Sequence, residues 1–289
     1  MKIAVLADIH SNYVAFQAAM QHLERWQPDQ VILAGDLVNR GPRPAECLQA
    51  FQDQAAHSGW QTVRGNHEDY VIEQADLHLQ ESSPAYEVHR ASRWTYQQLG
   101  EDVQLLRAMP FQRSLFAPDG SELRVVHASM RGMRDGIYPE TPDSTLAQQM
   151  APPPAVLCVG HTHRPLIRQV NGTLVVNAGS VGLPFDENPQ LAYARLTWLH
   201  GEWQAEIIRL PYDLAQARAD FFNSGYYTEA GPLTKLVLIE LQTARSMLFS
   251  WSYRYQVRAE HGLISMQDSV AEFLDEEFGG SARQRFGLE

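Results

Sequence analysis

Several short apolar runs in this chain end in side chains that could bind metal ions. The runs at residues 3–6, 31–33, 125–126 and 156–159 are rich in Val, Ile and Leu, which is typical of buried strands. The polar residues that follow such runs are Asp8, His10, Asp36, Asn66, His67, His127, His161 and His163. Because the carboxyl ends of parallel strands meet at one edge of a sheet, we expect these side chains to converge.

The residue types in this set indicate a particular chemistry. Carboxylate, amide and imidazole groups supply oxygen and nitrogen donors without any thiolate, which suits a pair of Mn, Fe, Zn or similar divalent ions. Asp8 and His10 are two positions apart, so both can point to one face of a strand end, and His161 and His163 repeat this spacing. Asp36 follows Gly35 and is the natural bridge between two ions. We interpret the set as a two-metal site for phosphoester hydrolysis.

Composition excludes several classes of protein. The 289 residues contain 44% hydrophobic and 20% charged residues, close to ordinary globular usage, and no apolar run approaches the length that spans a membrane. A formal net charge of −11 makes a nucleic-acid partner unfavourable. Cys47 and Cys158 lack CxxC spacing, so we expect neither a disulfide framework nor a thiolate zinc site, and we expect a cytoplasmic location.

The order of predicted elements indicates an α/β sandwich. Strands at 2–7, 30–35 and 60–64 alternate with helices at 12–25, at 44–56 and from about 68, which predicts parallel strands joined by right-handed crossovers. Helices are expected up to about residue 109. Strands then dominate, near 113–116, 122–127, 155–160, 165–170, 173–177, 191–198 and 202–209. Asn171-Gly172 predicts a hairpin with a type I′ turn.

A boundary is predicted where Gly, Tyr, Thr and Pro residues interrupt the pattern at 225–232. This gives a catalytic domain at 1–225 and a helical extension at 226–289. Apolar residues recur at helical spacing from Leu233 to Tyr255, and a shorter helix is expected from about Ser265. The extension is expected to cap the core, or alternatively to form a homodimer surface or a wall over the substrate.

The motifs D-x-H, G-D, G-N-H-[DE], H and G-H-x-H, in this order, resemble those of the calcineurin-like metallophosphoesterases over about residues 1–210. The resemblance implies a four-layer αββα sandwich with a C-terminal helical extension. It also implies two divalent ions, with Mn favoured in vitro, and direct attack on phosphorus by a hydroxide that bridges them. The implied ligands are Asp8, His10 and His163 for the first ion, Asn66, His127 and His161 for the second, and Asp36 as the bridge.

His67 is not a ligand in this resemblance. It lies beside the ions, stabilises charge on the phosphoryl oxygens and is a candidate to protonate the leaving group. The segment GDLVNRGP at 35–42 is similar to one found in phosphoprotein phosphatases and in symmetrical diadenosine tetraphosphate hydrolases. By this similarity Arg40 is the candidate phosphate clamp, the alternative being an ordinary surface arginine. Asn39 stands where those phosphatases carry an aspartate that pairs with the catalytic histidine.

The substrate is expected to be a small phosphorylated molecule. We predict a small-molecule phosphodiesterase or phosphatase. The alternatives are a symmetrical dinucleoside polyphosphate hydrolase, a phosphoprotein phosphatase, or a metal-binding scaffold without turnover. The segment NAGSVGLP at 177–184 has two interpretations that the sequence leaves open, a ligand-binding stretch of backbone amides or a tight turn between core strands.

Overall fold

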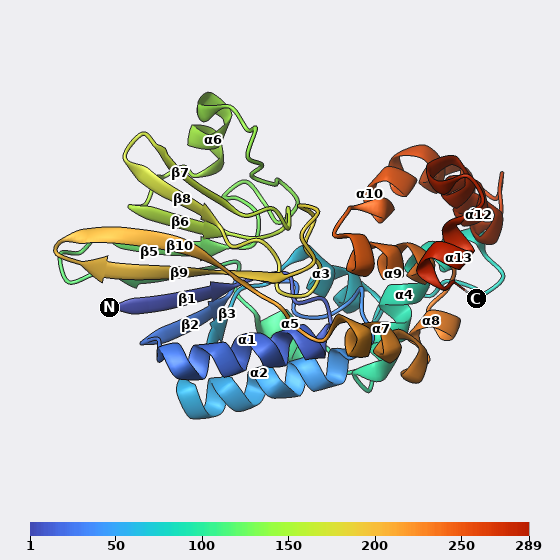
Figure 1. Ribbon diagram of the computed structural model, residues 1–289, viewed down its shortest axis with the longest axis horizontal. Coiled ribbons are helices and arrows are strands. Elements are labelled where there is room, and N and C mark those ends of the chain that lie inside the picture. Colours follow the sequence, from blue (N-terminus) through green and yellow to red (C-terminus); the bar gives the residue numbers. More distant parts are fainter. Residues whose placement is uncertain (289) are drawn as a thin grey trace.

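The computed structural model describes residues 1–288, which form two mixed sheets facing each other (Figure 1). The first sheet has the strand order β10-β9-β1-β2-β3 and the second β4-β5-β6-β8-β7. The first contains β1 (Lys2–Leu6), β2 (Gln30–Leu33), β3 (Gln61–Thr62), β9 (Leu191–Leu199) and β10 (Glu202–Leu210). The second contains β4 (Gln112–Phe116), β5 (Glu122–Val126), β6 (Val156–Val159), β7 (Leu166–Val170) and β8 (Thr173–Asn177).

Alternating apolar faces create the layers. Residues such as Val5, Ile32, Val125 and Val176 fill the space between the two sheets. The outer face of the first sheet is covered by α1 (Tyr13–Trp26) and α2 (Pro44–Ser58), and that of the second by the short helix α6 (Asp143–Gln149). This arrangement confirms the predicted α/β sandwich, with the second outer layer reduced to one helix.

Strand pairing explains why the predicted ligands share one edge. β1 pairs in parallel with β2, and β2 with β3, while β5, β6 and β8 run parallel in the other sheet. Their carboxyl ends therefore open toward the same side. The predicted strand at 60–64 is shorter than expected because the chain leaves the sheet after Thr62 and turns into α3 (Asn66–Glu73). Asn171 (φ 50°) and Gly172 (φ 86°) confirm the left-handed backbone of the predicted hairpin turn.

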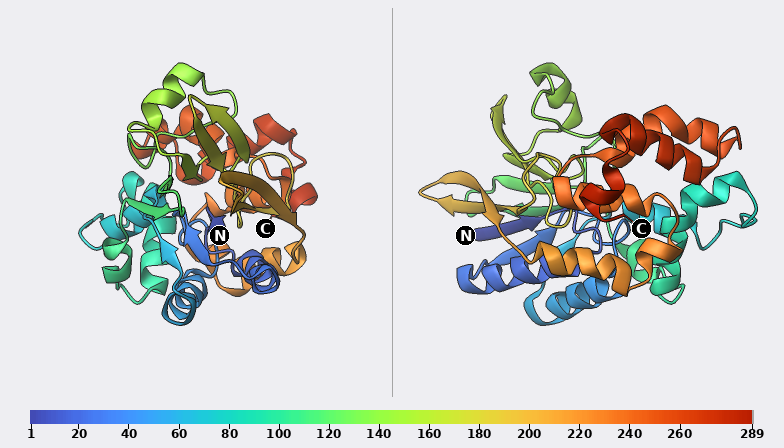
Figure 2. Two further views of the ribbon diagram at one scale, coloured as in Figure 1. Left: turned by 90° about the vertical axis from the view of Figure 1, so that its left-hand side faces the viewer. Right: turned by 45° about the vertical axis from the view of Figure 1, so that its right-hand side comes forward.

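A helical lobe lies beyond this edge (Figures 1 and 2). Its apolar core joins the C-terminal helices to Trp94, Leu183 and Phe221 from earlier in the chain. The helices that contribute to it are α4 (Pro84–Gln98), α7 (Leu214–Asn223), α8 (Tyr226–Glu229), α9 (Thr234–Thr243), α10 (Met247–Trp251), the π-helix η1 (Ser252–Gln256), α11 (Val257–Glu260), α12 (Met266–Phe278) and α13 (Ala282–Phe286). The short helix α5 (Gln104–Ala108) packs instead with the core that lies under the first sheet. The domain boundary at residue 225 stays a prediction.

The helical pattern from Leu233 to Tyr255 is divided in the structure. Helix α9 ends where Ala244 takes a left-handed conformation (φ 52°). The Glu240 carboxylate then accepts the N–H groups of Met247 and Leu248, each at 2.8 Å, and so starts α10. The helix predicted near Ser265 is confirmed as α12, with Ser265 as its N-cap. Among residues 1–288, none of these helices combines the length and apolar character needed to cross a membrane.

Candidate metal centre

All seven predicted ligands lie just beyond the carboxyl ends of the strands, six in loops and Asn66 at the first position of α3. Asp8 and His10 follow β1, Asp36 follows β2, and Asn66 begins α3 just after β3. The other three come from the second sheet, where His127 follows β5 and His161 and His163 follow β6. The site therefore lies at the common edge of both sheets, where the sequence predicted it.

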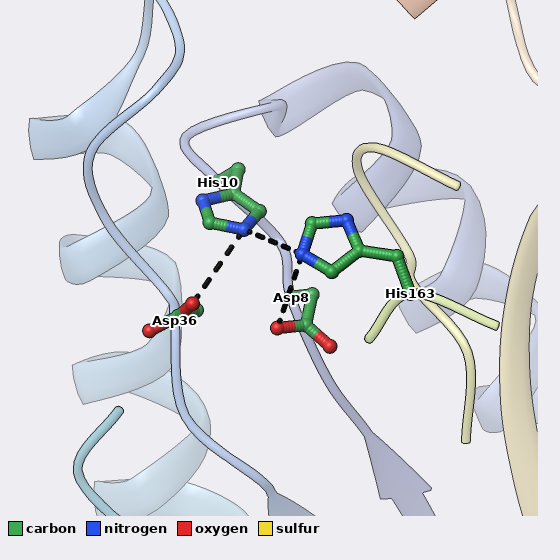
Figure 3. A group of neighbouring side chains, drawn as sticks. All are labelled: Asp8, His10, Asp36 and His163. Carbon is green, nitrogen blue, oxygen red and sulfur yellow. Dashed lines mark hydrogen bonds and ion pairs between the residues drawn. The ribbon is translucent and has the colours of Figure 1, made fainter. Parts of the chain in front are cut away.

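The first cluster consists of Asp8, His10, Asp36 and His163, all buried (Figure 3). One ligand atom from each lies within 4.8 Å of the others. The Nε2 atoms of His10 and His163 are 3.1 Å apart, and Nε2 of His10 is 3.7 Å from Oδ2 of Asp36. Two carboxylates and two imidazoles thus face one point, which is a suitable donor set for a divalent ion.

The second cluster shares Asp36 with the first. Asp36, His127 and His161 bring their ligand atoms within 4.8 Å of one another. Nε2 of His127 is 3.4 Å from Oδ2 of Asp36, 3.1 Å from Nδ1 of His161 and 2.9 Å from Oδ1 of Asn66. The Oδ2 atom of Asp36 is therefore near a histidine of each cluster, which is the position that a bridging carboxylate requires.

The hydrogen bonds of the Nδ1 atoms show whether the Nε2 atoms of the same imidazoles are free to bind a cation. Nδ1 of His10, of His127 and of His163 each face a backbone carbonyl, those of Asn39, Ala34 and Leu183. Since a carbonyl can only accept, each Nδ1 donates, and each neutral ring presents a lone pair at Nε2. The Nε2 atoms of His10 and His163 then face each other with no proton between them, and Oδ1 of Asp8 is buried without a hydrogen-bond partner. A cation bound here would satisfy all three atoms.

Burial controls the protonation of the site. It raises the pKa of Asp36 to about 7, and it lowers the pKa of His127 to about 4 and that of His161 to about 3. The histidines are thus neutral, the form that binds metal. The charge of Arg40 lowers the pKa values of Asp8 and Asp36, but burial raises them by more, and divalent ions would supply further positive charge.

The backbone at the site is unusual. Five of the seven predicted ligands have a positive φ, namely Asp8 (54°), His10 (48°), Asp36 (54°), His161 (66°) and His163 (57°). Residues other than glycine rarely adopt this conformation, and it is concentrated at functional sites. At Gly65 close approach requires glycine, because a Cβ would lie 2.1 Å from Oδ1 of Asp36.

Comparison with known proteins agrees with this geometry. Residues 1–200 match the model of the calcineurin-like phosphoesterase superfamily domain, which is more than half of the chain. The chain belongs to this superfamily. It is a metallophosphoesterase, an enzyme that hydrolyses phosphoric esters, and its cluster of carboxylates and imidazoles is suited to divalent metal ions.

Similar proteins span most of this chain. A metallophosphoesterase from Sphaerobacter thermophilus has 27% identity and a TM-score of 0.66, over 84% of this chain and 100% of that one. The hypothetical protein PH1004 from Pyrococcus horikoshii shares the fold, with 22% identity and a TM-score of 0.68 over 81% and 97% of the two chains. Uncharacterized protein MJ0912 of Methanocaldococcus jannaschii is 25% identical over 74% of this chain and 89% of its own length.

His67, Asn39 and Arg40 lie around this phosphoesterase centre. The His67 ring is 4.8 Å from that of His10, and its Nδ1 is 3.1 Å from Nδ2 of Asn39. Arg40 is half-buried, and among residues 1–288 its guanidinium has no carboxylate partner. Burial and then the charge of Arg40 lower the pKa of His67 well below its usual value. Asn39 and His67 are thus in contact through the amide nitrogen, and the roles of the three residues stay predictions.

Glu68, the acidic residue of the G-N-H-[DE] motif, is a supporting residue whose role the sequence did not assign. Its buried carboxylate accepts the N–H groups of Asp36, Leu37 and Gly65, each at 2.8 Å. It thereby ties the turn that carries Asp36 to the turn that carries Asn66. The glutamate three residues after Gly65, in a capping-box position, was the signal that could have indicated this role.

The segment at 177–184 contacts the loops that carry Asp8 and His163. Gly182 N–H and the Ser180 hydroxyl both donate to the backbone carbonyl of Asp8, at 3.0 and 2.7 Å. The Leu183 carbonyl accepts from Nδ1 of His163. These backbone and hydroxyl groups hold the ligand-bearing loops in place, so the structure favours the interpretation as a turn between core strands.

Proposed function

We propose that this protein is a binuclear, metal-dependent hydrolase of small phosphoesters, most simply a phosphodiesterase or phosphatase. The observation that carries the proposal is the shared carboxylate of Asp36, which lies between a histidine of each cluster. Asp8, His10 and His163 would hold one ion, Asn66, His127 and His161 the other, and Asp36 both. Two such ions would supply an activated water and neutralise the phosphoryl oxygens.

The side chains around the centre have separate tasks in this proposal. The neutral imidazole of His67 lies next to His10 and supplies a hydrogen bond to the phosphoryl or leaving oxygen. The guanidinium of Arg40, free of carboxylate partners among residues 1–288, binds the phosphate in a bidentate manner. No serine or cysteine nucleophile is required, and burial raises the pKa values of the two cysteine thiols, Cys47 and Cys158, which keeps them unreactive.

The helical lobe favours a small substrate. The Phe185 ring, part of the apolar core of the lobe, stacks on His163 with centroids 4.2 Å apart and an interplanar angle of 6°. Burial raises the pKa values of Glu240 and Tyr226 in this lobe, and the charge of Arg40 opposes both rises. The lobe is therefore close to the metal centre. It would hinder access of a folded phosphoprotein to the centre more than access of a small ester.

The test is hydrolysis by the purified protein with Mn²⁺. Bis(p-nitrophenyl) phosphate, p-nitrophenyl phosphate, a dinucleoside tetraphosphate, a phosphopeptide and single-stranded DNA form the panel. We expect turnover of the small diester or monoester that EDTA abolishes and Mn²⁺ restores. Metal-independent turnover, or preference for the DNA, would contradict the proposal.

Variants separate binding of metal from catalysis. His67→Ala is expected to lower kcat by about 10²- to 10⁴-fold, because a group that acts on the transition state is lost. Its metal content, measured by inductively coupled plasma mass spectrometry, should equal that of the unmodified protein. Asp36→Asn should instead deplete metal. Loss of both ions from His67→Ala would refute the role assigned to His67.

A further inference from the structure

The Asn39 side chain connects His67 to helix α4, which lies outside all the metal-binding motifs. Nδ2 of Asn39 is 3.0 Å from the Ser92 hydroxyl and 3.1 Å from Nδ1 of His67. Oδ1 of Asn39 accepts the Arg40 N–H at 2.9 Å. Asn39 is buried, and Ser92 is half-buried. The amide is therefore held on three sides.

These contacts determine which way the amide faces. The backbone N–H of Arg40 can only donate, so the atom of Asn39 beside it is the oxygen. The amide nitrogen then faces Ser92 and His67. Because an amide nitrogen only donates, the Ser92 hydroxyl oxygen accepts one of its hydrogens and Nδ1 of His67 accepts the other. The proton of the neutral His67 ring is consequently on Nε2.

Thr95, the other α4 hydroxyl near this amide, contributes less. It has one proton to donate, and its oxygen lies 3.1 Å from the Ala91 carbonyl but 3.4 Å from Oδ1 of Asn39. The backbone of His67 is fixed independently, since its N–H donates to Oδ1 of Asp36 at 2.9 Å. The backbone contact does not fix the rotation of the His67 ring or its tautomer. Asn39 restricts both through its hydrogen bond to Nδ1, and Ser92 holds the Asn39 side chain in place.

We propose that Ser92 is a positioning residue of the hydrolytic reaction. It holds the Asn39 amide so that His67 stays in the Nε2–H tautomer and presents that N–H as a hydrogen-bond donor. This role of Ser92 rests on the proposed function, since it matters for turnover only if His67 acts on the phosphoryl group. Helix α4 thereby becomes part of the catalytic apparatus although it supplies no ligand.

Kinetics of Ser92→Ala provide the first test. Alanine has a higher helix propensity than serine, so α4 should be retained. We expect kcat to fall about 3- to 10-fold, the size of one lost hydrogen bond, with KM within about 2-fold and metal content unchanged. Ser250→Ala is the matched control, a half-buried helical serine whose hydroxyl donates to the carbonyl of Ser246, the N-cap of α10, and it should leave kcat unchanged.

A double-mutant cycle distinguishes positioning from a general effect on the fold. In an Asn39→Ala background the contact with His67 is already lost, so Ser92→Ala should change kcat by less than about 1.5-fold. An equal loss in both backgrounds, or a Ser92→Ala enzyme as active as the unmodified one, would overturn the proposal.

The tautomer of His67 can be determined by NMR spectroscopy without any substrate. Long-range ¹H–¹⁵N spectra of the full-length, zinc-loaded protein should show His67 as the Nε2–H tautomer, and Ser92→Ala should show a mixture. An Nδ1–H tautomer in the unmodified protein would overturn the proposal even if the enzyme is active. Failure of the proposed function would appear separately, as absence of metal-dependent hydrolysis by the unmodified protein.

Discussion

Two hydrogen bonds hold His67, one at its backbone and one at its ring. Its backbone N–H is bound to Asp36, which shares its carboxylate between both clusters, and its ring is bound to the neutral side chain of Asn39. An aspartate at position 39 would accept a hydrogen bond from a protonated Nδ1 of His67, whereas the amide of Asn39 donates a hydrogen bond to Nδ1. The residue at 39 therefore sets how readily the imidazole carries a positive charge.

Asn39→Asp should change the pH dependence of the reaction. A carboxylate next to Nδ1 favours the imidazolium, so the pKa of His67, which burial and then Arg40 lower, is raised. In the variant the imidazolium of His67, the form that could also protonate the leaving group, persists to higher pH than in the unmodified protein, so the pKa at which kcat falls on the alkaline side should rise. Steady-state rates measured between pH 5 and about pH 10 check this. An alkaline limb that stays in place would argue against a functional contact between the two residues.

Residue types and spacing predicted which candidate metal ligands converge, because ligand chemistry permits few alternatives. Asp8, His10, Asp36 and the others stand directly after buried strands, where the sequence itself places them on one edge. Glu68 and Ser92 could not be assigned in this way. Their roles depend on contacts with residues 32 and 53 positions away, Asp36 and Asn39, which only the folded chain brings together.

At the scale of elements, the loop after β8 supports the loop after β1. Gly182 lies so close to the first loop that a Cβ there would be 1.8 Å from the Ile9 carbonyl oxygen. Gly172, in the hairpin between β7 and β8, has open space around it, with nothing within 4 Å of a Cβ. The two glycines make a matched pair for testing whether the second loop holds the metal site.

Gly182→Ala should lower the affinity for Mn²⁺ by at least about 10-fold and destabilise the fold by about 1 to 3 kcal/mol, since the first loop must shift. Gly172→Ala should cost about 1 to 2 kcal/mol, because its φ of 86° is unfavourable for alanine, yet bind Mn²⁺ normally. Isothermal titration calorimetry and denaturant unfolding measure both quantities. Equal metal affinity in the two variants would show that the loop at 177–184 does not support the centre.

Most strands and helices could be predicted from apolar periodicity, but their partners could not. The runs that became β9 and β10 give no local sign that they join β1 in the first sheet, because this pairing is long-range. Nor does the periodicity from Leu233 to Tyr255 reveal its break. The break depends on the buried carboxylate of Glu240, which starts a second helix.

At the scale of the whole molecule, the helical lobe has one face beside the centre and another that carries exposed apolar side chains. Phe249, Tyr253 and Val257, spaced by four residues, are 69%, 88% and 66% exposed. The predicted homodimer through the C-terminal helices would cover them. We expect the protein to sediment as a dimer and Tyr253→Glu to sediment as a monomer. A monomeric unmodified protein in analytical ultracentrifugation would contradict this prediction.

The central claim is that two divalent ions share the carboxylate of Asp36. Crystals soaked in Mn²⁺ and measured at the manganese absorption edge test it most directly. We predict two anomalous peaks about 3.5 to 4 Å apart, one next to His10 and His163, the other next to His127 and His161, and both within bonding distance of Asp36. A single peak, or a site that stays without manganese, would contradict the account.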